Sequence, residues 1–574
     1  MNKRVICRIN GESVGCLWNR QGNAISVNGK SNHNIQEEKL MVDKPEKRSP
    51  TESLDVKRKT EDIMSGKRPV DVLYPYIPPD YEVPFLHIGT QKQLFLDNFI
   101  LDHLDGVKRV FPKPDRPKEP IIRTKELPWE LKAGIFPAAA IHDPDDGKFK
   151  LWYVKDRIAA LCYAEATEPL HWEKPLSEEC IPYEDHKATN IVLDNSGHHV
   201  ALALNHDQSD KERKFLLINN PGDPGRGKKK TVFRVSSDGI RWNIVNENTP
   251  YQHHHYQRPI WDESIQKWIS YSQYSHHWNM LYRKRQIGRQ ESADYMNWSP
   301  KEVVLSVDWE PNLPPNLEFH DMSVRIVGGQ YIGVVTEFMA EPTWCNGGDH
   351  NWHDQAYAHL ALYASRDGKH WRRVGDTGPW ADNGKPGSYD YGFLNDSVAG
   401  QLVHNGKTYI VYGARPEKQR TSNKIGPKVL YSQAEADRGQ LVKALGKYPR
   451  MDYCSIGVLI LREDGWAELK PNYEMGQVIT RQFVFEGDTL KINAEAYGGY
   501  VKVEMLDTHF RPYEGFSAED CDPVYSDDPN QIWHTVRWKG NSDVGALWNK
   551  QVRIAFHLHQ ASLYAFQFED TEEA

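Results

Sequence analysis

Four acidic residues stand directly before or within apolar stretches. They are Glu130 in LPWELKAGIF, Asp321 in LEFHDMSVRI, Glu337 in GVVTEF and Asp390 in GSYDYGF. Turn formation does not require Asp321 or Asp390, whereas Glu130 could cap a turn and Glu337 could pair with an arginine. Two carboxyl groups in unlike surroundings can act as general acid and general base, because an apolar setting raises the pKa of one while the other stays ionised. Glu337 lies in the most apolar stretch and is the predicted general acid. Asp321 and Asp390 are the predicted base or nucleophile and its orienting partner, with Glu130 in reserve.

Histidine, arginine, asparagine and tryptophan side chains occur near the same stretches. Indole rings can stack on the C–H faces of sugar rings, while imidazole, amide and guanidinium groups can bond sugar hydroxyls. The predicted substrate contacts are His254, His255, His320, Asn190, Arg258, Trp344 and Arg415.

The histidines leave a second chemistry open. In a strand, His253 and His255 point to one face, and His186 and His320 could approach from neighbouring elements to bind a metal ion through neutral imidazole. Polar contacts to a sugar explain the same spacing. No metal ligand and no cofactor is therefore assigned from the residues alone.

A repeated turn motif indicates which elements position these side chains. The pattern Ser-x-Asp-x-x-x-Trp ends at Trp242, Trp298 and Trp371, and a degenerate copy ends at Trp172. In two copies Gly follows Asp, which favours a tight turn because glycine takes positive φ and Asp caps the loop. The copies recur at intervals of about 50–75 residues, as expected of a repeated structural unit.

Apolar hairpin patterns alternate with these turns. Strand, polar turn and strand are expected over 138–154, 190–204, 258–272, 323–335 and 399–413. Four strands per unit, five times over, predict a five-bladed β-propeller, whose central funnel is lined by residues at the beginning of each innermost strand. The fourth innermost strand would open with Glu318, His320 and Asp321. A large β-sandwich with coincidental turns is the alternative fold.

The two ends of the chain differ from this repeat. Residues 36–69 are charged, punctuated by proline and nearly free of aromatic side chains, so residues 1–85 are predicted to form a largely disordered or extended N-terminal extension. Residues 86–465 are assigned to the propeller. Apolar residues alternate over 490–507 and 550–570, so residues 466–574 are assigned to a C-terminal β-sandwich. The predicted fold class is all-β.

These features resemble the five-bladed propeller glycoside hydrolases around families 32, 43 and 68. The resemblance rests on the inner hairpin HDPDDGKFKLWYV, the outer Trp turns, GSYDYGF and the trailing sandwich, and it covers roughly residues 86–570. It implies cleavage of an oligo- or polysaccharide by funnel carboxylates, a secreted or periplasmic location, and calcium or a similar structural ion. Family 43 analogy implies inversion at the anomeric carbon. The W-M-N-D-P-N-G type, R-D-P and E-C motifs of family 32 are absent, so fructosidase activity is not expected.

Composition argues against several classes of protein. The chain of 574 residues carries a net charge of −8, which gives no electrostatic reason to expect a nucleic-acid partner. No apolar run reaches the roughly 18 residues needed to cross a bilayer. The first residues lack the apolar segment of a secretory signal, so the compartment stays open, as does the oligomeric state.

Two other functions fit the same scaffold. A carbohydrate-binding propeller without catalysis is favoured by the missing carboxylate before the third innermost strand, and a polysaccharide lyase would use Tyr and His instead. Two carboxyl groups facing each other in the funnel would indicate a hydrolase. A lining of His, Tyr and Arg would indicate a lyase or a binding protein.

Overall fold

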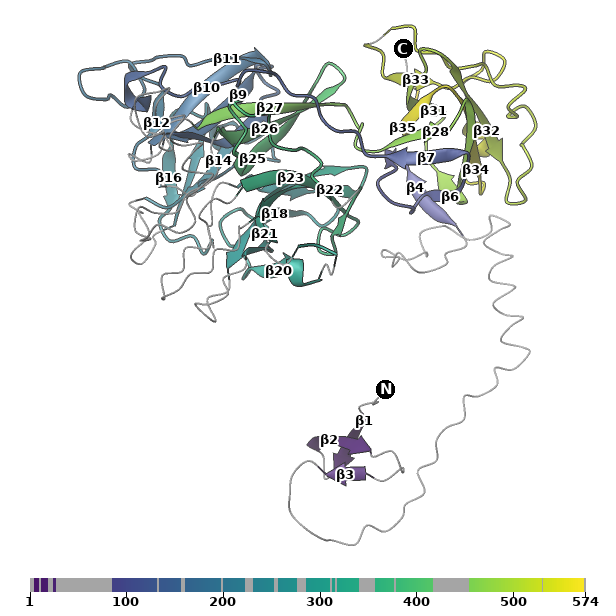
Figure 1. Ribbon diagram of the computed structural model, residues 1–574, viewed down its shortest axis with the longest axis horizontal. Coiled ribbons are helices and arrows are strands. Elements are labelled where there is room, and N and C mark those ends of the chain that lie inside the picture. The colour runs from purple at the N-terminus through teal and green to yellow at the C-terminus, as the bar shows by residue number, and fades with distance from the viewer. Residues whose placement is uncertain are drawn as a thin grey trace. The chain divides into compact units, whose positions relative to one another are not determined.

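The computed structural model describes strand residues 5–9, 12–18 and 24–26 and residues 85–571, except 132–133, 156–159, 198–199, 222–230, 252–256, 276–284, 310–311, 315–316, 340–356, 376–377, 417–453 and 529. The regular elements in this part are β-strands and short 3-10 turns, so the fold is all-β as predicted (Figure 1). The 3-10 turns are η2 (Pro128–Glu130), η3 (Lys211–Arg213), η4 (Val307–Trp309) and η6 (Gly545–Leu547). Within the described ranges, no helix is long and apolar enough to cross a membrane.

The N-terminal unit, Met1–Pro69, contains a small antiparallel sheet. Its strands are β1 (Val5–Ile9), β2 (Glu12–Trp18) and β3 (Ala24–Ser26). The sequence predicts a disordered or extended chain here, but apolar residues alternate in VICRI and allow hairpin pairing. The charged stretch 36–69 lies outside the described residues.

Between residues 135 and 462 the strands form successive antiparallel sheets, numbered here in chain order (Figure 1). The first sheet holds β8 (Ile135–His142), β9 (Phe149–Lys155), β10 (Ala160–Glu168), β11 (His171–Glu173) and β12 (Ile191–Leu193). The second holds β13 (Val200–Leu204), β14 (Phe215–Asn219), β15 (Val232–Ser236) and β16 (Asn243–Asn246). The third holds β17 (Ile260–Asp262), β18 (Lys267–Ser275), β19 (Arg285–Ser292) and β20 (Glu302–Leu305).

The fourth and fifth sheets are connected by a single parallel bridge between Ala358 and Phe393. The fourth holds β21 (Leu317–Val327), β22 (Gln330–Met339), β23 (Tyr357–Ser365) and β24 (Arg372–Arg373). The fifth holds β25 (Phe393–His404), β26 (Lys407–Arg415) and β27 (Ser455–Arg462).

The hairpins expected over 138–154, 258–272, 323–335 and 399–413 are present as β8–β9, β17–β18, β21–β22 and β25–β26. The hairpin expected over 190–204 is wrong. β12 pairs with β10, whereas β13 pairs with β14. The polar turn between them does exist, with Asn195 at φ 51° and Gly197 at φ 77°. It carries the chain from the first sheet to the second, where Asn219 donates to the carbonyl of Ser196 at 2.9 Å.

The repeated turns share one hydrogen-bonding pattern. In the second sheet, the Asp238 carboxylate accepts the backbone N–H groups of Ile240 and Arg241 at 2.8 and 2.9 Å. The Ser236 hydroxyl accepts the N–H of Gly239 at 2.8 Å. Asp294 and Asp367 accept the corresponding N–H groups in the third and fourth sheets. The recurrence in sequence is therefore a recurrence of local structure.

These turns also join neighbouring sheets. Trp152 of the first sheet donates its indole N–H to the carbonyl of Gly239 at 2.8 Å, and Tyr271 of the third donates to the carbonyl of Gly368 at 2.7 Å. In the third sheet Tyr295 takes the glycine position, at φ 61°, and donates to a carbonyl of the second sheet. Trp298 and Trp371 are each 6% exposed, whereas Trp242 is half-buried.

Apolar clusters fill the space between consecutive sheets. A further cluster packs the fifth sheet on the first, where Ala399 and Val411 meet Ile135 and Leu151. The segment that precedes the first sheet lies along β27, the last strand of the fifth sheet. Isolated β-bridges join Asp115 to Ile460 and Ile122 to Ile456. The two ends of the series of sheets are thereby in contact.

The remaining strands come from both ends of residues 86–569. They are β4 (Leu86–Gly89), β5 (Gln93–Leu94), β6 (Leu101–Asp105), β7 (Val107–Val110), β28 (Glu468–Pro471), β29 (Met475–Thr480), β30 (Phe483–Phe485), β31 (Thr489–Glu495), β32 (Tyr500–Leu506), β33 (Trp533–Thr535), β34 (Arg553–His559) and β35 (Ser562–Glu569). One sheet has the order β33-β31-β35-β28-β7 with β5 on β35, a second has β32-β34-β29-β6, and β30 pairs with β4. Residues 86–110 thus pair with the C-terminal strands and not with the repeat to which they are assigned from the sequence.

Candidate functional site

The beginning of β21 places two acidic side chains on one face of the fourth sheet. Glu318 lies opposite Phe338 of β22, and Asp321 lies opposite Thr336. Directly opposed residues point to the same face, and so do residues two apart in one strand. A bulge at His320 makes this arrangement possible, because residues three apart in a regular strand point to opposite faces.

Burial determines the state of the Asp321 carboxyl. The residue is 5% exposed, and its Oδ2 lies 2.7 Å from Nδ1 of His320. Burial raises the pKa of Asp321 well above its ordinary value of 3.8, and the positive charge of Arg285 opposes this shift only in part. Asp321 therefore retains its proton at pH values where an ordinary aspartate is ionised, as a general acid must.

Glu318 has a cationic partner. Its Oε2 lies 3.1 Å from Nη1 of Arg285, which begins β19 of the third sheet. The Arg285 guanidinium also lies over the Phe338 ring, 4.6 Å from the centroid. A neighbouring positive charge favours the ionised form of a carboxylate. Two acids on one face thus occupy unlike environments.

Aromatic and basic groups from other sheets surround this pair. The ring centroids of Phe338 and Phe393 lie 5.6 Å apart, and His320 is stacked on Phe338 at 5.7 Å. The Arg415 guanidinium lies over Phe393 and over Phe136 of β8, at 5.4 and 5.2 Å from their centroids. The first, third, fourth and fifth sheets all contribute to this cluster. Phe338 and Phe393 are fully buried, so these rings pack the fourth and fifth sheets together beside the acidic pair.

Glu337, the predicted general acid, lies in a different setting. Opposite Phe319, it occupies the other face of the sheet from Asp321. Its carboxylate accepts hydrogen bonds from Tyr363 and from two nitrogens of Arg373, all at 2.9 Å, and His359 Nε2 also lies 2.9 Å away. Burial alone would raise the pKa of Glu337, but the bonds from His359 and Arg373 lower it overall. A carboxylate held ionised in this way is poorly suited to donate a proton.

Asp390 is buried and paired. Its Oδ2 lies 2.6 Å from Nη1 of Arg116 and accepts a hydrogen bond from the Tyr412 hydroxyl at 3.0 Å. Its Oδ1 accepts a bond from Ser388 at 2.7 Å. Arg116 directly follows Asp115, which bridges the outermost strand of the fifth sheet. These contacts tie the segment before the first sheet to the loop before β25.

Glu130 and Asn190 belong to one buried network beside the first sheet. Glu130 accepts bonds from Tyr153 and Lys174, each at 2.8 Å. Asn190 donates to the Tyr153 hydroxyl at 2.7 Å and accepts the Trp129 indole N–H at 2.9 Å. The polar groups of the network satisfy one another, which anchors η2 to the sheet.

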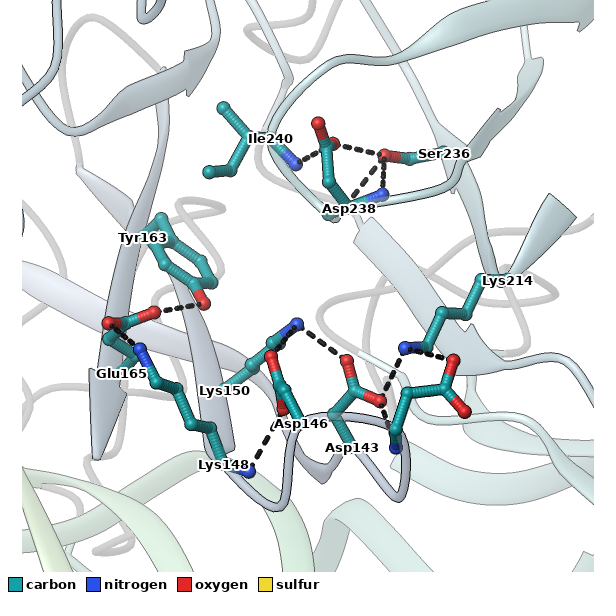
Figure 2. A network of polar contacts seen from close by, with 12 residues as sticks. Asp143, Asp146, Lys148, Lys150, Tyr163, Glu165, Lys214, Ser236, Asp238 and Ile240 are labelled. Carbon is teal, nitrogen blue, oxygen red and sulfur yellow. Dashed lines mark hydrogen bonds and ion pairs between the residues drawn. The ribbon is translucent and has the colours of Figure 1, made fainter. Parts of the chain in front are cut away.

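The turn DPDDG between β8 and β9 is the centre of an ion cluster (Figure 2). Asp143, fully buried, lies 2.5 Å from the ammonium groups of both Lys150 and Lys214. Burial alone would raise the pKa of Asp143, but the bonds from these two lysines lower it overall. Lys214 directly precedes β14, so the cluster links the first sheet to the second.

Three of the remaining predicted substrate contacts lie outside the described residues: His254, His255 and Trp344. The fourth, Arg258, lies where the inner strands converge. Among the residues that are described, no group of three or more His, Cys, Asp and Glu could hold a metal ion.

Glu318 has no role predicted from the sequence, and nothing in the sequence points to Arg285 or Phe338. Regular alternation along LEFHDMSVRI would place Glu318 and Asp321 on opposite faces, so only a bulge at His320 could have indicated that they share a face. Arg285 lies in another sheet, and no residue near Glu318 in the sequence indicates it.

No family model and no curated protein matches the chain. Among solved structures, it is similar to a Bombyx mori family 32 β-fructofuranosidase at 10% identity, covering 79% of this chain and 94% of the other, with a TM-score of 0.37. A thermostable family-43 glycoside hydrolase shares 12% identity over 51% of this chain and 87% of its own, with a TM-score of 0.33. An N-acetylgalactosamine deacetylase from F. plautii, in complex with blood group B trisaccharide, shares 14% identity over 63% of this chain and 97% of its own, with a TM-score of 0.36. At such scores, function must rest on the site.

Proposed function

We propose that residues 115–462 form a closed five-bladed β-propeller and that residues 86–110 and 468–569 form a β-sandwich. Support comes from the apolar clusters between consecutive sheets and from the one between the fifth sheet and the first. The bridges from Asp115 and Ile122 to β27 would supply the outermost strand of the fifth blade and close the ring. Residues 1–85 are proposed to be an appended N-terminal segment.

We propose that the protein is a glycoside hydrolase acting on an oligo- or polysaccharide. The observation that carries this proposal is the pair of unlike acids at the beginning of β21: Asp321, whose pKa burial raises, and Glu318, paired with Arg285 at 3.1 Å. Glycosidic cleavage needs one protonated and one ionised carboxyl group, and unlike environments supply them.

In this mechanism Asp321 donates its proton to the glycosidic oxygen as the bond to the anomeric carbon breaks. Glu318 either removes a proton from the water that attacks the anomeric carbon, or attacks that carbon itself. In the second case water then cleaves the bond between Glu318 and the sugar and gives its proton to Asp321. Arg415 would bond the hydroxyls of the sugar. His254, His255 and Trp344 remain predicted contacts.

A screen of the full-length protein against a panel of polysaccharides, with chromatographic analysis of the products, tests this function. Hydrolysis by the wild type that falls by about 10²–10⁴-fold in Asp321→Asn supports it. Asp390→Asn serves as the matched control, because both oxygens of its carboxylate are already bonded, by Arg116, Tyr412 and Ser388, and it should keep turnover per folded molecule. Equal loss in both variants, or products with an unsaturated sugar end, would reject the assignment. NMR of the first-formed anomer then separates inversion from retention.

A carbohydrate-binding propeller without catalysis is the second candidate. The absence of a carboxylate before the third innermost strand favours this candidate, because the residue before Pro259 and β17 is Arg258. Binding of a glycan without product release would support this candidate over hydrolysis.

A further inference from the structure

The sheet β32-β34-β29-β6 has one buried face and one face towards solvent. Alternation along YVKVEML and RIAFHLH places Val501 and Leu558 on the buried face, where they are 0% and 1% exposed. Tyr500 and His559 stand opposite each other in neighbouring strands and lie on the other face. Met475 of β29 stands opposite His559 and shares this outer face. A row of side chains thus crosses three neighbouring strands on the solvent side.

The rings in this row are packed against one another. The Tyr500 ring is stacked on the His559 imidazole, with centroids 4.9 Å apart and an interplanar angle of 9°. Tyr525 meets Tyr500 edge to face, with centroids 6.2 Å apart. Tyr525 directly follows Val524, which bridges to β32, so it extends the row beyond the edge of the sheet. A Cβ atom on Gly499 would collide with the carbonyl oxygen of His559, so glycine lets the turn before β32 approach β34 closely.

We call these four side chains the outer strip: Tyr525, Tyr500, His559 and Met475. Tyr525 is 51% exposed and Met475 is 65% exposed, so both ends of the strip are in contact with water. Between them, Nδ1 of His559 is buried and has no hydrogen-bond partner in the described part of the chain. A contiguous exposed apolar surface marks an interaction site, and a buried polar atom without a partner indicates a missing ligand or water. The outer strip therefore has the features of a binding surface.

Charge and size decide what the outer strip can bind. The next two outward residues of β32, Lys502 and Glu504, are engaged by the loop at Ala518, through its carbonyl and its N–H, each at 3.0 Å. The strip itself contains no Lys, Arg, Asp or Glu, so it offers no charge to the phosphates of a nucleic acid. Three strand spacings make it about 14 Å long, and one pleat makes it about 7 Å wide. It thus covers roughly 100 Å², far below the roughly 800 Å² that each partner contributes to a stable protein interface.

We propose that the outer strip binds a neutral oligo- or polysaccharide. Sugar rings present C–H faces that pack on the tyrosine and histidine rings, and the phenol groups bond the sugar hydroxyls. Nδ1 of His559 and the amide of Gln477, which is two residues from Met475 and on the same face, supply further hydrogen bonds. The strip lies on β32, β34 and β29, whereas Asp321 lies on β21. Binding at the strip therefore does not depend on the proposed hydrolysis, and it attaches the protein to a glycan without occupying the acidic pair.

Affinity electrophoresis of the full-length protein in native gels that contain xylan, arabinan, galactan or hydroxyethyl cellulose tests this site. At least one of these glycans should retard the wild type. Tyr525→Ala should weaken binding by about two- to tenfold, and the double variant with Tyr500→Ala by about tenfold or more, because ring contacts are lost. Trp548→Ala is the matched control, with binding unchanged, because this exposed indole precedes β34 whereas His559 ends it, about 20 Å along the strand. Asp321→Asn should be retarded like the wild type, which separates the strip from the acidic pair.

Hydrogen exchange of the wild type, with and without the glycan that retards it, provides a readout that does not require any variant to fold. Slower exchange over 496–502, 524–526 and 557–560, with 545–551 unchanged, would support the proposal. It would be overturned if no glycan retards the wild type, if the double variant is retarded equally, or if protection is confined to the five sheets. A wild-type dimer that becomes monomeric in Tyr525→Ala would also overturn it and would point to a second copy of this chain.

Discussion

Replacing Glu337 with glutamine separates a structural carboxylate from a catalytic one. Glutamine keeps the shape of the side chain but removes the charge that faces Arg373, His359 and Tyr363. The Arg373 side chain is 8% exposed, so water cannot replace the lost partner. Breaking one side of a buried ion pair costs about 3–5 kcal/mol, and we expect a loss of unfolding free energy in that range.

Urea denaturation followed by tryptophan fluorescence, together with turnover per folded molecule, measures both effects. Glu337→Gln should unfold at lower urea while its turnover stays within about tenfold of the wild type, since the residue lies on the other face from Asp321. Tyr363→Phe removes one hydrogen bond to the same carboxylate and should cost about 1.5–3 kcal/mol. Glu318→Gln should lower turnover by about 10²–10⁴-fold as well as stability, because its partner Arg285 is also buried. A Glu337→Gln protein of wild-type stability with turnover reduced by orders of magnitude would refute this reasoning.

Three further predictions concern packing and charge. Trp371→Ala should lower the free energy of unfolding by about 3–5 kcal/mol in urea without changing glycan affinity, because the indole is buried between the third and fourth sheets. Asp321→Asn should flatten the pH dependence of thermal stability: the raised pKa means that folding loses stability as pH rises from about 4 towards that pKa, and asparagine does not titrate. Lys214→Met should lower the thermal transition, because it leaves buried Asp143 with one ammonium partner in place of two.

Local chemistry made much of the fold predictable. The Ser-x-Asp turns could be recognised because Asp238 and its equivalents bond backbone groups two and three residues ahead, within a single stretch of sequence. Pairing between distant segments could not be recognised in this way. Residues 86–110 join the C-terminal strands through contacts that span most of the chain, such as Lys470 opposite Lys108. The strand over 191–193 is present where the sequence predicts it, but it pairs with β10 and not with β13.

The same distinction explains the site. The sequence indicates Asp321 as a candidate because an acid beside an apolar strand is costly to bury. It predicts a base or nucleophile there, whereas burial raises the pKa of Asp321 and the proposed function makes it the general acid. The partners that distinguish Glu337 and Asp390 were not predictable. Arg373 lies 36 residues from Glu337, and Arg116 lies 274 residues from Asp390. Nothing in the sequence near either acid indicates these arginines, so both looked available for chemistry.

The most direct test of the central assignment is the leaving-group dependence of Asp321→Asn. A general acid matters when the departing oxygen must be protonated and matters little when the leaving group is already stable as an anion. For the sugar identified in the screen, we predict that Asp321→Asn lowers turnover of the alkyl or glycosyl substrate by about 10²–10⁴-fold and turnover of the dinitrophenyl glycoside by far less. An equal reduction for both substrates, or no reduction for either, would contradict the assignment of Asp321 as the proton donor.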